Sequence, residues 1–256
     1  MILNYGNTPI FYTTKGTGNP LVLLHGFLES TKIWEPFIEK LSAKRQVICI
    51  DLPGHGKSGN ISEIHNMELM ADAVHAVLKH LKIDQASLVG HSMGGYVSLA
   101  FLEKFPGMTK SLVLMNSTPE DDSEEKKIIR DRSIAIVRKN KKVYVNMAIT
   151  NLLPPEKLIK FKAELEELII QAFKMSKEGI VAALKGMKIR TNRNLVLRNF
   201  RNPKYLILGT KDPVLSAETT QAIGNFCECK LIFIDGGHLS YMENYTAVDE
   251  FLHFID

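Results

Sequence analysis

A serine flanked by glycines follows a short apolar run in the first half of the chain. Segment 90–95 reads Gly-His-Ser-Met-Gly-Gly, directly after the apolar residues 86–89 and before a helical pattern. In a G-x-S-x-G turn between strand and helix, the serine hydroxyl stands clear of the sheet beside the helix N-terminus. A side chain at Gly90 or Gly94 would collide with the neighbouring strand and helix. The spacing therefore predicts a nucleophile at Ser92.

A serine hydroxyl is a weak nucleophile, so a base and an orienting acid are needed. Asp212 and His238 each follow an apolar run, 205–208 and 230–234. Because open parallel sheets bind ligands at the carboxyl ends of their strands, all three side chains are expected at one edge. The chain order Ser, Asp, His is that of one of three convergent triads. We predict that His238 takes the Ser92 proton and later protonates the leaving group, while Asp212 fixes the imidazole tautomer.

Acyl transfer also needs donors for the developing oxyanion. His25-Gly26-Phe27 follows the apolar run 21–24, and a turn there can direct a backbone N–H towards the serine. The predicted donors are the amides of Phe27 and Met93, the latter being the residue after the nucleophile. His25 is predicted to bond the loop backbone rather than to take part in chemistry.

Short apolar runs alternate with helical patterns over most of the chain. The runs lie at 21–24, 47–50, 86–89, 111–115, 205–208 and 230–234, and the helices at about 31–43, 66–81, 93–105, 216–226 and 244–255. Near-continuous apolar runs are typical of strands covered on both faces. The alternation predicts an α/β fold with a mostly parallel sheet, and segments 2–6 and 9–15 are expected to form a leading hairpin.

Between about 118 and 200 the strand-like runs stop. Helices are predicted near 121–139, 141–150 and 178–190, and apolar residues at three- and four-residue steps from Leu158 to Phe173 predict another. Pro154-Pro155 and Glu156 suit its start. We interpret this stretch as a helical lid inserted between two strands of one sheet.

These motifs together resemble the α/β-hydrolase superfamily over essentially the whole length. They are His25-Gly26-Phe27, the segment 51–58, the segment 90–95, the segment 209–213 and Gly236-Gly237-His238, in family order. The resemblance implies an eight-stranded, mostly parallel α/β-hydrolase sheet with helices on both faces and a helical cap after the sixth strand. The implied division is a core of 1–117 and 201–256 with a cap of 118–200.

Composition excludes several classes of protein. The chain has 256 residues, is 45% hydrophobic and 23% charged, and carries a formal charge of +4. These values are typical of a globular protein and not of disordered or collagen-like chains. No apolar run reaches membrane-spanning length, no signal peptide is visible, and three cysteines make no disulfide framework, so a cytoplasmic protein is expected. No cofactor, metal, nucleic acid or membrane partner is predicted, and Cys227-x-Cys229 alone does not suggest a zinc site.

The predicted function is cofactor-independent hydrolysis of a small carboxylic ester, thioester or lactone by way of an acyl-enzyme on Ser92. Relatives that use the triad for elimination, such as the menaquinone-pathway SHCHC synthases, carry arginine where this chain has Tyr96. Relatives that hydrolyse carbon–carbon bonds typically carry Asn where this chain has His91. Both chemistries stay open as alternatives, as does a small-molecule receptor of the same fold that retains the triad without turnover.

The positive charge is concentrated in the predicted lid. Residues 120–200 carry 18 Lys and Arg against 11 Asp and Glu, a net charge of +7, whereas the rest of the chain has a net charge of −3. One interpretation is a solvated helical surface. The other is that lid charge favours anionic acyl groups by steering them into the cleft.

Overall fold

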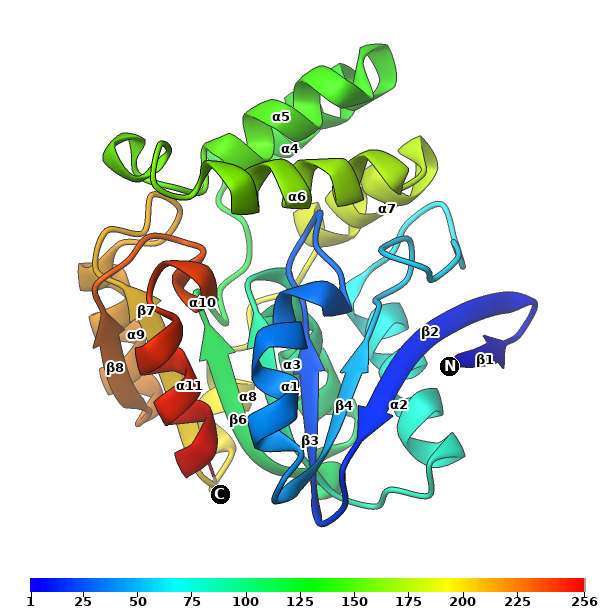
Figure 1. Ribbon diagram of the computed structural model, residues 1–256, viewed down its shortest axis with the longest axis vertical. Coiled ribbons are helices and arrows are strands. Elements are labelled where there is room, and N and C mark those ends of the chain that lie inside the picture. The colour runs from blue at the N-terminus through cyan, green and yellow to red at the C-terminus, as the bar shows by residue number, and fades with distance from the viewer. Residues whose placement is uncertain (256) are drawn as a thin grey trace.

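An eight-stranded sheet forms the centre of the computed structural model, which describes residues 1–255 (Figure 1). The spatial order is β1-β2-β4-β3-β5-β6-β7-β8. The first two strands pair antiparallel with their neighbours and the rest are parallel. The strands are β1 (Ile2–Tyr5), β2 (Thr8–Lys15), β3 (Asn19–Leu24), β4 (Arg45–Ile50), β5 (Ala86–His91), β6 (Thr109–Met115), β7 (Lys204–Gly209) and β8 (Lys230–Ile234).

Helices cover both faces of this sheet. On one face lie α1 (Glu35–Leu41), which follows a 3-10 turn (Thr31–Trp34), and α11 (Tyr245–Phe254). On the other lie α2 (Met67–His80), α3 (Met93–Lys104), α8 (Asn194–Asn199) and α9 (Ala217–Cys227). A short 3-10 turn, Pro106–Met108, leads into β6, and the short helix α10 (Ser240–Glu243) follows the loop after β8.

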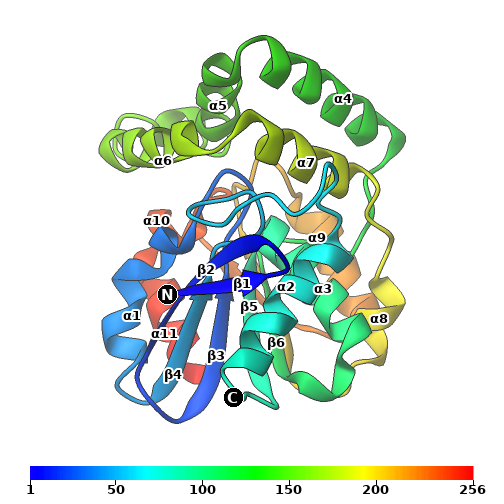
Figure 2. The same ribbon diagram turned by 90° about the vertical axis from the view of Figure 1, so that its right-hand side faces the viewer.

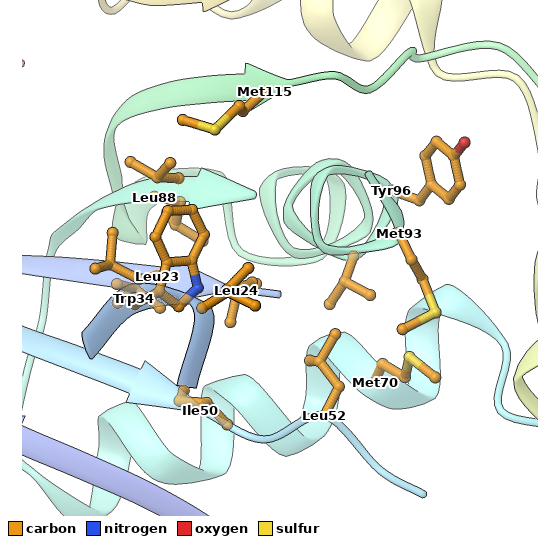
Figure 3. Packing of buried hydrophobic residues seen from close by; sticks show 14 of the residues in the cluster. Leu23, Leu24, Trp34, Ile50, Leu52, Met70, Leu88, Met93, Tyr96 and Met115 are labelled. Atoms are coloured by element: carbon orange, nitrogen blue, oxygen red, sulfur yellow. The ribbon is translucent and has the colours of Figure 1, made fainter. Parts of the chain in front are cut away.

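The central strands are buried on both faces, which explains their near-continuous apolar sequences. All six residues of β5 are buried, as are the last four of β3 and of β4. Figure 3 shows part of the core, including Leu23, Leu88 and the fully buried Trp34. Trp34 packs against the aromatic rings of Phe37 and Tyr241, which agrees with a packing role for this residue. A rigid sheet thus supports the loops at its carboxyl edge.

A layer of helices lies over that edge (Figure 2). It consists of α4 (Glu124–Lys139), α5 (Lys141–Thr150), a 3-10 turn (Pro155–Lys157), α6 (Lys162–Lys174) and α7 (Lys177–Lys188). All of it is inserted between β6 and β7, so the predicted fold class, including the helical insertion after the sixth strand, is confirmed. Helix α8 lies with the core helices rather than with this layer. The division into 1–117, 118–200 and 201–256 stays a prediction.

One helix begins later than its sequence pattern suggests. The apolar stripe from Leu158 predicts a start at the proline pair, but α6 begins at Lys162. The two prolines lack backbone donors, and the residues around them are tied to the core. The His238 amide donates to the Leu152 carbonyl oxygen at 3.2 Å, and the Lys157 ammonium lies 3.0 Å from the Glu243 carboxylate. These contacts hold the segment as a separate turn.

No helix among residues 1–255 combines the length and hydrophobicity that a membrane span requires. The predicted leading hairpin and the predicted strands and helices are present, with bounds that differ by a few residues.

Candidate active site

Ser92 occupies a strained turn between the central strand β5 and helix α3. Its backbone has φ 48° and ψ −114°, a left-handed φ that costs on the order of 1 kcal/mol or more for a residue with a side chain. The Ser92 amide donates to the Met115 carbonyl oxygen at 2.9 Å. A Cβ on Gly90 would run into the Gly94 backbone, and a Cβ on Gly94 would run into Leu24. The two glycines therefore permit the close approach of strand and helix that exposes the serine.

The structure brings the three predicted side chains together in one hydrogen-bonded chain. The Ser92 Oγ lies 2.9 Å from Nε2 of His238. The Nδ1 of the same ring lies 2.9 Å from Oδ2 and 3.1 Å from Oδ1 of Asp212. Ser92 follows β5, Asp212 follows β7 and His238 follows β8, all at the carboxyl edge of the sheet. This geometry permits proton transfer from the hydroxyl to the imidazole.

Hydrogen bonds to both carboxylate oxygens stabilise the ionised form of Asp212. Burial favours the neutral acid, but His238, a 2.8 Å bond from the Asn116 side chain and a 2.7 Å bond from the Val214 amide outweigh it. The pKa of Asp212 is therefore held below its usual range. Asn116 also donates to the Gly237 carbonyl oxygen at 3.1 Å, so it fixes the acid and the histidine loop together.

The two amides predicted to bind an oxyanion lie beside the serine, on the loop after β3 and at the start of α3. Within residues 1–255, neither the Phe27 nor the Met93 amide donates a hydrogen bond to the protein. Leu28 has φ 65°, and the loop turns tightly there. The Gly26 amide donates to Oε2 of Glu29 at 2.6 Å, which anchors the loop from below. The oxyanion role of the two amides stays a prediction.

A buried ionic cluster lies beneath this loop. The Nδ1 of His91 lies 2.9 Å from Oε2 of Glu29, and its Nε2 lies 2.9 Å from the backbone oxygen of His238. The Tyr241 hydroxyl donates to the other Glu29 oxygen at 3.0 Å. Burial disfavours charge on His91, but Glu29 outweighs it and the pKa of His91 is raised; the same pairing outweighs burial and lowers the pKa of Glu29. The sequence pattern did not signal Glu29.

The neighbouring histidine and aspartate of the other loop motifs have structural roles. The Leu52 amide donates to Nε2 of His25 at 2.9 Å, and Nδ1 of the same ring faces the Gly26 carbonyl oxygen at 2.7 Å. Asp51 accepts from the amides of Thr31 at 2.7 Å and Lys57 at 2.8 Å. Both side chains thus hold loop backbone, which for His25 is the predicted role.

A pocket of about 280 Å³ opens onto Ser92 between the sheet edge and the helical layer. Its apolar walls include Phe27, Met147, Leu152, Met187 and Val214, and its polar walls include Arg130, Ser133, Tyr144 and Asn151. The volume suits a small ligand. A larger groove of about 510 Å³ lies between α1 and α6, but the residues that line it do not include Ser92.

No cluster of three or more His, Cys, Asp or Glu within residues 1–255 has the arrangement of a metal site. Cys227 and Cys229 are both reduced, and burial raises the pKa of the Cys229 thiol to about 12. Besides Glu29, two site residues had no clear sequence signal: Asn116, although it directly follows an apolar run, and Arg130, one of many cations of the lid.

The fold agrees with comparisons to known proteins. The α/β-hydrolase fold family matches residues 19–245, and the chain belongs to that family. The dihydrolipoyllysine-residue acetyltransferase component of the acetoin cleaving system of Pseudomonas putida is 30% identical to this chain over 238 residues. That match covers 91% of this chain but only 62% of the relative's length.

Two further matches are hydrolases by name. The (E)-2-((N-methylformamido)methylene)succinate hydrolase of Acinetobacter baylyi is 25% identical, with 84% of this chain and 80% of that protein covered. A malate-bound thermophilic esterase from Thermogutta terrifontis superposes with a TM-score of 0.91 at 28% identity, covering 96% of this chain and 92% of the esterase.

Proposed function

We propose that this α/β-hydrolase cleaves small carboxylic esters, thioesters or lactones through an acyl-enzyme on Ser92. The observation that carries the proposal is the unbroken chain from Ser92 Oγ through both nitrogens of His238 to Asp212. A serine in that chain can lose its proton as it attacks a carbonyl carbon.

The residues divide the reaction between them. In acylation, His238 Nε2 accepts the Ser92 proton while the hydroxyl oxygen attacks, and it then delivers that proton to the leaving alkoxide or thiolate. Asp212 keeps the Nδ1 proton directed towards itself and stabilises the imidazolium. The Phe27 and Met93 amides donate to the carbonyl oxygen as it becomes negative. In deacylation, His238 takes a proton from water, the hydroxide attacks the acyl carbon, and Ser92 leaves with the proton returned to it.

The names of two relatives support this substrate class. The Thermogutta terrifontis protein is called an esterase and the Acinetobacter baylyi protein a hydrolase of a substituted succinate. The acetyltransferase name of the Pseudomonas putida relative also fits chemistry at an acyl carbon. The pocket of about 280 Å³ favours small acyl groups.

A panel of methyl esters of increasing acyl length, with lactones of matched size, tests the proposal. Hydrolysis is followed by base consumption at constant pH for wild type and Ser92→Ala. We expect turnover of short esters or lactones that is lost in Ser92→Ala. Because Ser92→Ala removes only the hydroxyl oxygen and leaves the other lining residues unchanged, equal turnover by the two proteins would contradict the proposal. A wild-type protein that binds these compounds without turnover would favour the receptor alternative.

A further inference from the structure

Arg130 on helix α4 is a cation in the wall of the Ser92 pocket. It lines this pocket together with Ser133, one helical turn further on, and Tyr144 of the next helix. Its side chain is 23% exposed, so it is neither fully buried nor free in solvent. The three polar side chains form one patch on the side of the pocket opposite the sheet.

Among residues 1–255, Arg130 has one carboxylate partner, Asp122, which it shares with a second arginine. Its Nε donates to Oδ2 of Asp122 at 3.0 Å, and Nη1 of Arg190 donates to Oδ1 of the same carboxylate at 2.6 Å. The Asp122 side chain is fully buried, which disfavours its charge, but the two guanidinium groups outweigh burial and hold the pKa of Asp122 below its usual range. Two positive charges thus face one negative charge.

Arg190 is held in place by several protein groups. Its Nε donates to the Glu120 carbonyl oxygen and its Nη1 to the Met187 carbonyl oxygen, each at 3.0 Å. Its guanidinium lies 4.1 Å from the ring centroid of Tyr96, and its side chain is only 2% exposed. The excess positive charge of the cluster therefore belongs to Arg130.

The terminal nitrogens of Arg130 have no hydrogen-bond acceptor among residues 1–255, since its one hydrogen bond uses Nε. The other charged groups of the pocket wall do not offset it. Glu29 is paired with His91, and His238 is paired with Asp212. A guanidinium with free terminal donors in a small pocket can bind both oxygens of a planar anion.

We propose that Arg130 binds a carboxylate borne by the substrate itself, so that the preferred substrate is a small ester or lactone of an acid that carries a second, free carboxylate. This inference rests on the proposed hydrolase function and names its substrate class. One unbalanced positive charge matches a monoanion, whereas a phosphate dianion would leave a negative charge in a pocket with no second free cation among the described residues.

Pairs of esters that differ only in the charged group isolate the contribution of the carboxylate. Monomethyl succinate carries the carboxylate on the acyl side, and methyl 4-oxopentanoate has the same skeleton with a methyl group in place of the charged oxygen. Acetoxyacetate carries it on the alcohol side, and acetoxyacetone is its neutral counterpart. Methyl 3-phosphonopropanoate, with a dianion at the same position, distinguishes a carboxylate site from a phosphate site.

Three variants isolate the role of Arg130. Arg130→Met keeps much of the side-chain length but removes charge and donors, and Arg130→Lys keeps charge without the planar fork. Arg132→Met removes the same charge two residues along the same helix, where the side chain is exposed and does not line the pocket. It is the control for general steering by the basic lid.

We expect wild type to prefer one carboxylated ester over its neutral counterpart in kcat/KM. Loss of a charge-assisted pair lowers kcat/KM for that ester by about 10- to 100-fold in Arg130→Met. The kcat/KM of Arg130→Lys for the carboxylated ester is intermediate, and Arg132→Met changes this value less than about threefold. The ratio of kcat/KM for the charged ester to that for its neutral counterpart falls in Arg130→Met and stays near the wild-type value in Arg132→Met. Circular dichroism verifies that all four proteins are folded.

Equal loss for both members of a pair, or equal loss in Arg132→Met, would overturn the proposal while hydrolysis itself stands. A preference for the phosphono ester would replace the carboxylate by a phosphate group and would also overturn it. Binding of monomethyl succinate to Ser92→Ala, measured by calorimetry with and without Arg130→Met, decides the matter without turnover. Binding that is lost only with Arg130→Met supports the site even if the hydrolase proposal fails, and binding that persists contradicts it.

Discussion

The imidazole of His91 places its Nε2 2.9 Å from the backbone carbonyl oxygen of His238. Its other nitrogen faces the Glu29 carboxylate at 2.9 Å, so both ring nitrogens face acceptors and both carry protons. His91, the residue before Ser92, therefore holds the backbone of His238 by a charged, buried hydrogen bond. Because Glu29 also accepts from the Gly26 amide, one ion pair links the Ser92 turn, the loop after β3 and the loop that carries His238.

Replacing Glu29 by Gln should leave His91 buried without its counter-charge. Breaking a buried pair by removing one partner costs about 3 kcal/mol or more, which urea unfolding monitored by circular dichroism measures. Tyr241→Phe, which removes only one hydrogen bond to the same carboxylate, should cost about 1 kcal/mol.

The cost of Glu29→Gln should also depend on pH. The lowered pKa of Glu29 contributes stability that is present above its unfolded value of 4.5 and is lost on acidification. The raised pKa of His91 contributes stability that is fully present below 6.5 and is lost as the pH rises through the folded value. The difference in unfolding free energy should therefore be largest between pH 4.5 and 6.5. A difference that grows steadily above pH 6.5 would mean that the pair is not ionic.

Gly26→Ala should disable the oxyanion loop. A Cβ at this position would lie 2.7 Å from Oε2 of Glu29 and 2.9 Å from Nδ1 of His91, both buried, so the loop must move away. Displacing an oxyanion donor costs about 100-fold in kcat. Gly107→Ala is the matched control, because a Cβ there meets nothing within 4 Å. Similar rates for the two variants on a short ester would count against the assigned loop.

Asn116→Asp should weaken Asp212 by putting a carboxylate where an amide now donates at 2.8 Å. A like charge at that distance raises the pKa of Asp212, so the loss of kcat/KM grows as the pH falls. We expect a fall of at least about tenfold at neutral pH. Asn199→Asp, an exposed change on α8, adds the same charge far from the site and should leave the profile unchanged. A pH-independent loss would show that Asn116 acts on the loop alone.

The buried histidines should make the protein sensitive to acid. Burial first, and the nearby His25 second, lower the pKa of His55 to about 3. The unfolded chain therefore binds a proton that the folded state excludes, and stability is complete above pH 6.5 and falls as the pH drops towards 3. His55→Gln should reduce the slope of unfolding free energy against pH by about 1.4 kcal/mol per unit in this range. Parallel slopes for the two proteins would contradict the assignment.

The sequence predicted the parts of the site that are tied to local backbone geometry. Ser92 and the glycines around it could be identified because the strained turn tolerates few residue types. Asp212 and His238 could be identified because each lies a few residues after an apolar run that predicts a strand. Residues that act across the fold had no such signal: Glu29 meets His91 only when the loop after β3 folds over β5.

The position of Arg130 in the pocket wall could not be predicted from the sequence either, because it depends on which side of α4 faces the sheet. The charge count located a surplus in residues 120–200, but α4 carries several cations on a half-exposed helix. Only the packing of that helix over the sheet edge turns Arg130 inward and leaves Arg132 outside. The late start of α6 has a similar origin, because the contacts of Leu152 and Lys157 with the core are tertiary.

The most direct measurement for the central claim is the intact mass of the protein after incubation with a fluorophosphonate, followed by peptide mapping. The proposed chemistry predicts that wild type gains one phosphonyl group on the peptide that contains Ser92, and that folded Ser92→Ala gains none. A folded wild-type protein that stays unmodified, or a group found on another serine in both proteins, would contradict it.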